Sequence, residues 1–269
     1  MYTPVGFFAP QGGGNLIPIS GYSLYLDMQD SPRTVVSGKL QDITDLSTAG
    51  YIFSQSDSSL RPYFNEVNGF VSGSNGGANW YLDCENANDI LTNRQPNTNG
   101  NDFSFVIGTN AAFNSDNFAA AFEMGTNTGG LGSDRYRFSF NFNEGGTAQM
   151  VSMFYYYEMR QFSVTNDLSK GYLGFMNSPG GNSTKYFYQR GSTETTAPTE
   201  TGQWISDSSW YQITRLGNRS RSNMPSRTPE LSRGFQANIY FVAVYPFQLT
   251  SQDRQDIADW FTAKWGLSL

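Results

Sequence analysis

Residue types that could perform catalysis are scarce in this chain of 269 residues. The chain has no histidine, which excludes Ser-His-Asp and Cys-His catalysis and every histidine-dependent zinc site. Catalysis would therefore need carboxylates, and Asp83, Glu85 and Asn88 come nearest to the E-x-D-x-x-E pattern of sandwich-fold glycoside hydrolases. Asn88 stands where the third acid belongs and cannot transfer a proton. We therefore expect a protein that is not an enzyme.

Two kinds of segment could offer oxygen ligands to calcium. Residues 129–137 fit the nonapeptide G-G-x-G-x-D-x-U-x, but that motif works as stacked repeats and the chain holds one copy. The oxygen-rich clusters at 97–102 and 83–89 lack the spacing of a defined calcium loop. A glycine-rich hairpin loop and ordinary turn residues account for these segments, so we expect no metal and no cofactor.

Aromatic rings are the remaining residue type with a chemical use, because an exposed ring can stack on a sugar. The candidates for such a glycan platform are Tyr155, Tyr157, Tyr186 and Tyr188. Neighbouring residues of a strand face opposite sides, so about half of any aromatic run must point to the core. Packing and subunit contact therefore compete with sugar binding as roles for these rings.

The elements that would position these residues are mostly strands. Aromatic residues make up 16% of the chain and charged residues 15%, and this balance, together with abundant glycine, is typical of strands joined by tight turns. In residues 135–142, four rings alternate with polar residues, which is the period of a half-buried strand. The predicted strands are 22–27, 103–108, 118–124, 135–142, 149–157, 171–176, 185–189, 210–216 and 236–245.

One helix is predicted, at about 251–265. Thr250 and Ser251 offer N-caps, Asp253 lies in the first turn, and Gly266 supplies the C-terminal stop. Apolar residues recur every four positions in between. Many strands followed by one terminal helix predict an all-β domain rather than a parallel α/β sheet, because crossover helices are absent.

Charge, cysteine content and the N-terminus limit the partners and the compartment. A net charge of −6 argues against nucleic acid, and Cys84, the one cysteine, permits no intrachain disulfide. The first residues lack the features of a secretory signal and no stretch is long enough to span a membrane, so we expect folding in a cytoplasm. Prolines around a glycine run predict an extended arm at 1–21, followed by a single domain at 22–269.

Two stretches carry a family resemblance. Near the start these are LYLDMQD at 24–30, GKLQDITDLS at 38–47 and RPY at 61–63; at the far end they are IYFVAVY at 239–245 and AKWGL at 263–267. Together they resemble the laminin-G-like branch of the concanavalin A-like lectin and glucanase superfamily. The resemblance implies a jelly-roll sandwich of two antiparallel sheets, with the C-terminal helix packed across one end. It implies a recognition or adhesion module rather than an enzyme.

A compact, histidine-free sandwich with a glycine- and proline-rich arm also resembles virion proteins of tailed bacteriophages. We therefore predict a structural protein exposed on a phage particle, either a capsid decoration (cement) protein or a tail or fibre component. It would act by burying subunit interfaces with other virion proteins and with copies of itself, and the arm residues Phe7, Phe8, Ile17 and Ile19 would add contacts. The alternative is a carbohydrate-binding module that recognises host surface glycans.

Overall fold

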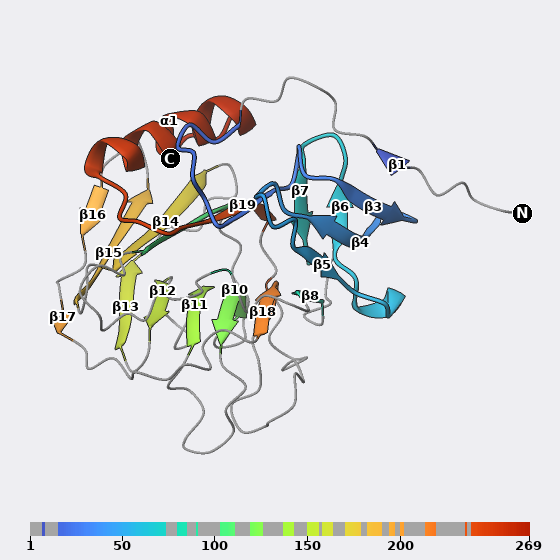
Figure 1. The fold of residues 1–269 in the computed structure, drawn as a ribbon, viewed down its shortest axis with the longest axis horizontal. Helices are drawn as coiled ribbons and strands as arrows, with labels where there is room; N and C mark the ends of the chain where they lie inside the picture. The colour runs from blue at the N-terminus through green and yellow to red at the C-terminus, as the bar shows by residue number, and fades with distance from the viewer. Residues whose placement is uncertain are drawn as a thin grey trace, which may run out of the picture.

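The computed structural model describes residues 7–8, 16–73, 80–84, 90, 103–110, 119–125, 137–142, 150–155, 158–163, 170–178, 182–189, 194–196, 200–201, 213–218, 235 and 238–269. In this described part the chain is an all-β, jelly-roll-like sandwich of antiparallel strands with a single α-helix, α1 (Ser251–Trp265), at its C-terminus (Figure 1). The predicted fold class is confirmed.

One layer of the sandwich lies directly under the helix. Its strands, in order across the sheet, are β15 (Asn182–Gln189), β14 (Gly171–Ser178), β9 (Phe103–Asn110), β19 (Asn238–Tyr245) and β2 (Leu24–Asp27). The last strand of the chain therefore lies between the first strand of this layer and β9, since Val242 pairs with both Leu26 and Ile107. This pairing brings the two ends of the domain together.

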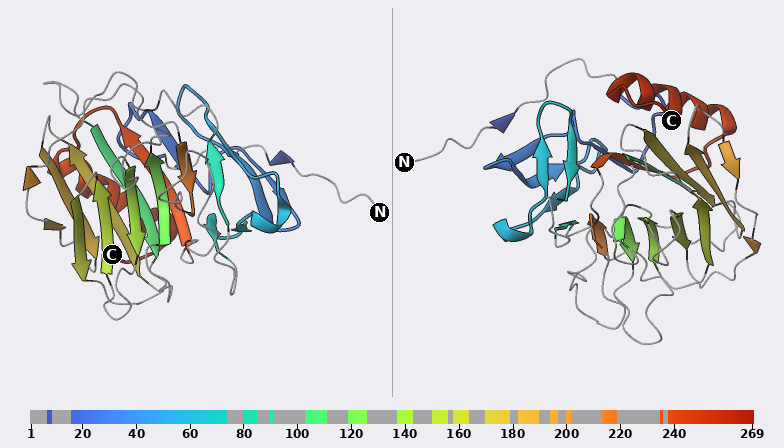
Figure 2. Two further views of the ribbon diagram at one scale, coloured as in Figure 1. Left: turned by 90° about the horizontal axis from the view of Figure 1, so that it is seen from below. Right: turned by 180° about the vertical axis from the view of Figure 1, so that it is seen from behind.

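The second layer faces the first, as the two views of Figure 2 show. Its strands, in order, are β13 (Glu158–Ser163), β12 (Met150–Tyr155), β11 (Arg137–Phe142), β10 (Ala119–Gly125), β18 (Ile213–Leu216), β8 (Leu82–Cys84), β5 (Ile52–Ser54), β4 (Lys39–Thr44) and β3 (Arg33–Val36). The hairpin of β6 (Tyr63–Asn65) and β7 (Phe70–Ser72) links the layers, because β6 pairs with β4 and β7 pairs with β19. Shorter elements are η1 (Ser58–Leu60), β16 (Glu194–Thr196) and β17 (Glu200–Thr201).

The layer under the helix is buried on both faces. Along β19, Val242 and Val244 pack into the cluster between the two layers, whereas Phe241, Ala243 and Tyr245 pack into a second cluster beneath α1. The side chains of β19 therefore alternate between the two faces of the sheet, but the residues on both faces are apolar. That is why β9 and β19 appear in the sequence as nearly continuous apolar runs.

The helix lies across the outer face of this layer. Ile257, Trp260 and Phe261 belong to one cluster with Phe175 and Phe241 of the strands beneath. The expectation that the helix packs across one end of the sandwich is wrong. Its apolar positions meet the outer face of a sheet that carries large apolar residues on both sides, and covering that face removes much more apolar surface from water than capping an end would.

Every strand predicted from the sequence has a counterpart in the structure, with ends shifted by a few residues. The strands from β3 to β8 were not predicted, because runs of three to six residues give little alternation to detect. The stretch 149–157, predicted as one strand, corresponds to β12 (Met150–Tyr155) alone, and β13, which begins at Glu158, was not predicted.

Candidate functional site

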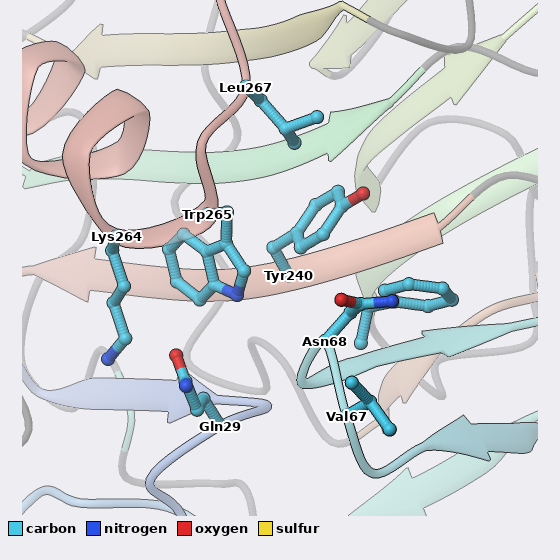
Figure 3. Close-up of a pocket in the computed structure, with 8 residues that line it drawn as sticks. Gln29, Val67, Asn68, Tyr240, Lys264, Trp265 and Leu267 are labelled. Carbon is cyan, nitrogen blue, oxygen red and sulfur yellow. The ribbon is translucent and has the colours of Figure 1, made fainter.

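A pocket of about 290 Å³ opens where four segments of the chain meet (Figure 3). The segments are the end of α1, the hairpin of β6 and β7, the loop that follows β2, and β19, which supplies Tyr240. Its size lies near the lower limit of the roughly 300–1,000 Å³ typical of small-molecule sites, which suits a single small ring. The lining residues are Gln29, Val67, Asn68, Phe70, Tyr240, Lys264, Trp265 and Leu267.

Local sequence explains how two of these segments reach the pocket. Gly266 ends α1 in the left-handed conformation with φ of 65°, which turns the chain so that Leu267 follows Trp265 into the wall. In the hairpin turn, the Asn65 side-chain oxygen accepts hydrogen bonds from the backbone N–H groups of Val67 and Asn68, at 3.1 and 2.9 Å. The Asn65 side chain therefore holds the tip of the turn in place.

Three rings form the aromatic wall. Tyr240 stands between Phe70 and Trp265, with ring centroids 5.5 Å from each. Trp265 in turn stacks on Phe241, with centroids 5.8 Å apart and planes inclined by 6°. Because the wall rests on the buried cluster beneath α1, its rings are held in place before any ligand arrives.

The polar lining consists of amides and one ammonium group. Gln29 and Asn68 are exposed side chains on opposite sides of the opening (Figure 3). An amide carries both a donor and an acceptor, so each can bond a hydroxyl group in either sense. Lys264 supplies the one charged side chain of the lining.

The ammonium of Lys264 is bound by two carboxylates beside the pocket. Its Nζ donates to Asp27 Oδ2 and to Asp30 Oδ2, both at 2.6 Å, and it also lies over the Trp260 and Trp265 rings at 5.3 and 5.1 Å. The Lys264 side chain is 5% exposed. Such a buried, paired charge fixes the end of the helix to the loop after β2.

Asp27 is the centre of this network. Its Oδ2 also accepts the phenolic O–H of Tyr25 at 2.5 Å, and its Oδ1 accepts the backbone N–H groups of Gln29 and Asp30. Burial, reinforced by the Asp27 charge, raises the pKa of Tyr25 far above its ordinary value, so this hydroxyl stays protonated as a donor. The carboxylate is thereby occupied on both oxygens and positions Gln29 through its backbone.

The indole N–H of Trp265 is an unusual feature of the wall. Its nitrogen is buried and has no hydrogen-bond partner among the described residues. In Figure 3 this nitrogen lies on the side of the ring that faces Gln29 and Asn68. A buried donor without an acceptor costs free energy, and an acceptor group of a ligand in the pocket would remove that cost.

A second charged cluster involves Asp83, which the sequence marked as a possible catalytic acid. Arg215 donates to both oxygens of Asp83, at 2.5 and 2.9 Å, and Arg215 is fully buried. Glu123 stands on the other side of Arg215 in the strand register. A carboxylate held through both oxygens by a guanidinium is one half of an ion pair rather than one of two free catalytic acids. Glu85 and Asn88, the other members of the pattern, lie outside the described residues.

The structure tests few of the other predicted site residues. Tyr155, Tyr186 and Tyr188 lie on β12 and β15, where their side chains are not described, and Tyr157 lies outside the described residues. In the strand register, Tyr186 is opposite Phe175 and Tyr188 is opposite Leu173. The glycan platform expected of these tyrosines stays a prediction.

The arm residues behave in two ways. Phe7 and Phe8 form β1 (Phe7–Phe8), which pairs with Thr34 and Arg33 at the free side of β3. Ile17 is buried in the cluster beneath α1, and Ile19 packs against that cluster. These two isoleucines therefore contact their own domain, and subunit contacts by the arm stay a prediction.

The described residues form neither a clustered metal site nor a membrane-spanning helix. They include no group of three or more cysteine or carboxylate side chains that could share a metal ion. The three segments considered for calcium, at 83–89, 97–102 and 129–137, fall mainly outside the described residues. No described helix is both long enough and apolar enough to cross a bilayer.

Sequence reasoning missed the pocket itself. Gln29, Lys264 and Trp265 were noted as part of a family resemblance, but nothing indicated a site there. Asn68 belonged to no motif. Gln29 and Asn68 share only proximity in the fold, which a single sequence does not reveal.

Comparison with known proteins identifies the fold but no family. No protein-family model matches the chain, and no curated protein matches it. A Trypanosoma rangeli sialidase structure, in complex with a difluoro-KDN compound, is similar over 92% of this chain and 33% of that chain, with a TM-score of 0.57 and 9% identity. An arabinofuranosidase complexed with arabinofuranosyl-α-1,2-xylobiose matches over 91% and 59% of the two chains, with a TM-score of 0.55 and 9% identity.

A third structure, the CBM40 module of a Ruminococcus gnavus sialidase bound to α2,3-sialyllactose, matches over 59% of this chain and 81% of that chain, with a TM-score of 0.43 and 16% identity. The chain thus spans a third of the length of the Trypanosoma sialidase and 59% of the arabinofuranosidase. At 9% identity, the likeness to the Trypanosoma sialidase and to the arabinofuranosidase shows a shared β fold alone. None of these three is a virion protein, so the expected virion role stays a prediction.

Proposed function

We propose that this chain is a carbohydrate-binding module and that the pocket at the end of α1 holds one sugar ring. The observation that carries the proposal is the pairing of an aromatic wall with hydroxyl-binding groups. Tyr240 and Trp265 offer ring surface for the C–H groups of a sugar, while Gln29 and Asn68 offer amides for its hydroxyl groups. The unpartnered indole N–H of Trp265 adds a donor.

The same geometry favours binding without turnover. Asp27 and Asp30 are the carboxylates recorded in contact with a lining residue. Both are bound to Lys264. A carboxylate held by an ammonium is poorly suited to protonate a leaving group. Incubation of the protein with polysaccharides should therefore release no reducing ends.

The test is a glycan array followed by calorimetric titration of the best ligand. Asn68→Ala and Gln29→Ala should each weaken binding at least about fivefold, because each removes a hydroxyl partner. Both side chains are exposed, and the hydrogen bond at position 68 within the turn comes from the backbone, so the fold should survive. Gln252→Ala, which removes an exposed amide at the other end of α1, is the matched control and should bind like the wild type.

Replacement of Trp265 by phenylalanine gives a sharper result. Trp265→Phe keeps a ring in the wall but removes the buried N–H. The affinity for the ligand should fall. In NMR spectra, the indole N–H resonance that is missing from this variant should be the one that shifts when ligand binds to the wild type. Equal affinity of the wild type, Asn68→Ala and Trp265→Phe for every ligand found would place the binding site elsewhere.

A second function, assembly with copies of itself or with other virion proteins, is favoured by one observation. The β1 strand pairs with the free side of β3, the arrangement through which an arm can add a strand to a neighbouring subunit. Deleting residues 1–15 should then lower the oligomeric state in solution, or the incorporation into particles, while the fold is retained. The deletion must stop before Ile17, because that residue belongs to the buried cluster.

A further inference from the structure

We infer that the pocket selects a neutral sugar ring and excludes sugars that carry a carboxylate. This inference rests on the proposed glycan-binding function and specifies the ligand of the same site. It follows from the charges beside the lining rather than from the shape of the pocket.

The one cationic side chain of the lining has no free charge to offer. Lys264 Nζ donates to Asp27 and Asp30 at 2.6 Å each, and two tryptophan rings cover its remaining side at 5.1 and 5.3 Å. In Figure 3 the Lys264 side chain runs toward β2, away from Tyr240 and Asn68. An anionic ligand would have to displace one of two carboxylates that are already in place.

The sum of charges at the pocket is negative. Lys264 contributes one positive charge, and Asp27 with Asp30 contribute two negative charges. The next cation along the loop, Arg33, donates to the carbonyl oxygens of Gln29 and Ser31 and faces the Phe64 ring at 4.5 Å. Glu66 on the hairpin acts on Arg33 electrostatically and offsets its charge. A ligand carboxylate would therefore add to an existing excess of negative charge in a partly desolvated place.

The remaining polar groups are neutral. Gln29 and Asn68 carry amides, and the buried N–H of Trp265 needs a single acceptor, which a hydroxyl or ring oxygen supplies. Neutral partners suit hydroxyl groups, since neither side loses the hydration of a full charge. The site thus contains attractive groups for a neutral ring and a repulsive group against an acidic ring, which together give specificity.

Matched ligand pairs test this directly. Methyl glucoside is compared with methyl glucuronide, methyl galactoside with methyl galacturonide, and lactose with sialyllactose, by calorimetric titration at low and at physiological salt. Within the pair that binds, the neutral member should bind at least about tenfold more tightly, and the difference should shrink as salt rises. Tighter binding of an acidic member, lost in Asn68→Ala, would overturn the charge argument but leave the glycan-binding function intact. No binding to any member or to a glycan array would overturn the function itself.

A charge variant isolates the cause. Asp30→Asn removes one of the two carboxylates on Lys264, while the backbone N–H of residue 30 can still donate to Asp27. It should raise the affinity for the acidic ligand of the pair at least about fivefold, and it should leave the affinity for the neutral ligand within about twofold of the wild type. Asp259→Asn, an exposed residue on α1, changes the net charge by the same amount away from the pocket and should alter neither. Equal effects of the two variants would show that net charge, rather than the carboxylate at the pocket, sets the preference.

Discussion

Lys264 and Asp27 are 237 residues apart in the chain, yet the Lys264 ammonium lies 2.6 Å from Asp27 Oδ2. This ion pair joins the last turn of α1 to the end of β2, an edge strand of the sheet beneath the helix. Asp27 is fully buried and the Lys264 side chain nearly so. The contact therefore holds together the two ends of the domain and one side of the proposed sugar pocket.

Breaking this pair from one side should destabilise the protein strongly. Asp27→Ala leaves the Lys264 ammonium with Asp30 as its one carboxylate partner. It also removes the oxygen that accepts the hydrogen bond of the Tyr25 hydroxyl. We expect a loss of about 3–5 kcal/mol in the free energy of unfolding, measured by urea denaturation. Lys264→Met should cost a similar amount, because it leaves Asp27 buried without a cation.

A double-mutant cycle checks the interpretation. Asp27→Asn and Lys264→Met are made singly and together. The double variant should lose clearly less free energy of unfolding than the sum of these two single losses, since no unpaired charge remains at residue 27. Asp259→Ala, on the exposed face of α1, serves as the control and should change stability by no more than about 0.5 kcal/mol. Additive effects of the two buried changes would contradict the proposed coupling.

Gly217 should tolerate no side chain. Its φ is +86°, and a Cβ built on it would collide with the ring of Trp80, whose Nε1 is held at 2.6 Å by the Phe235 carbonyl oxygen. Gly217→Ala should cost at least about 3 kcal/mol in thermal or urea unfolding, from strain and overpacking together. Gly38 also has a positive φ but open space around it, so Gly38→Ala should cost only the conformational strain of about 1–2 kcal/mol.

The N-terminus of α1 should depend on its capping box. Thr250 accepts a hydrogen bond from the Asp253 backbone N–H, and the Asp253 carboxylate accepts one from Thr250 N. Thr250→Ala should therefore lower the free energy of unfolding by about 1 kcal/mol. Thr262→Ala, the same replacement within the helix, should be neutral or slightly stabilising, because alanine has the higher helix propensity. Equal losses in both variants would argue against the cap.

The buried tyrosines should make the protein unstable in alkali. Burial raises the pKa values of Tyr25, Tyr240 and Tyr245 above the ordinary value near 10. Since the unfolded chain loses these protons first, stability is fully present below about pH 10 and falls as the pH rises beyond it, by about 1.4 kcal/mol per pH unit for each group. Guanidinium unfolding at pH 8 and pH 10.5 measures this fall.

Tyr245→Phe provides the matched variant. The Tyr245 hydroxyl is buried and has no hydrogen-bond partner among the described residues. Removing it should leave stability at pH 8 unchanged or raise it by up to about 1 kcal/mol, and should reduce the alkaline loss. A marked loss of stability at pH 8 would show that the hydroxyl makes a contact with another part of the chain.

Local patterns carried most of the predicted fold. The strand at Arg137–Phe142 was predicted from rings that alternate with polar residues, and α1 was predicted at its observed bounds from Thr250, Asp253 and Gly266. Short strands such as β5 and β8, with three residues each, escaped prediction because their pairing partners rather than their own sequence stabilise them. The position of the helix, over a sheet face rather than at an end, was also beyond the local pattern.

The sequence by itself determined the class of structure and excluded chemistry that depends on histidine. Absence of histidine, abundant aromatic residues and glycine-rich turns are properties of composition, and caps and strand periodicity are properties of neighbours along the chain. Only the tertiary structure decided where a site lies. It brings Gln29, Asn68 and Trp265 to one opening and neutralises Lys264 with Asp27, because burial of the sheet under α1 fixes contacts between residues that have no local relationship.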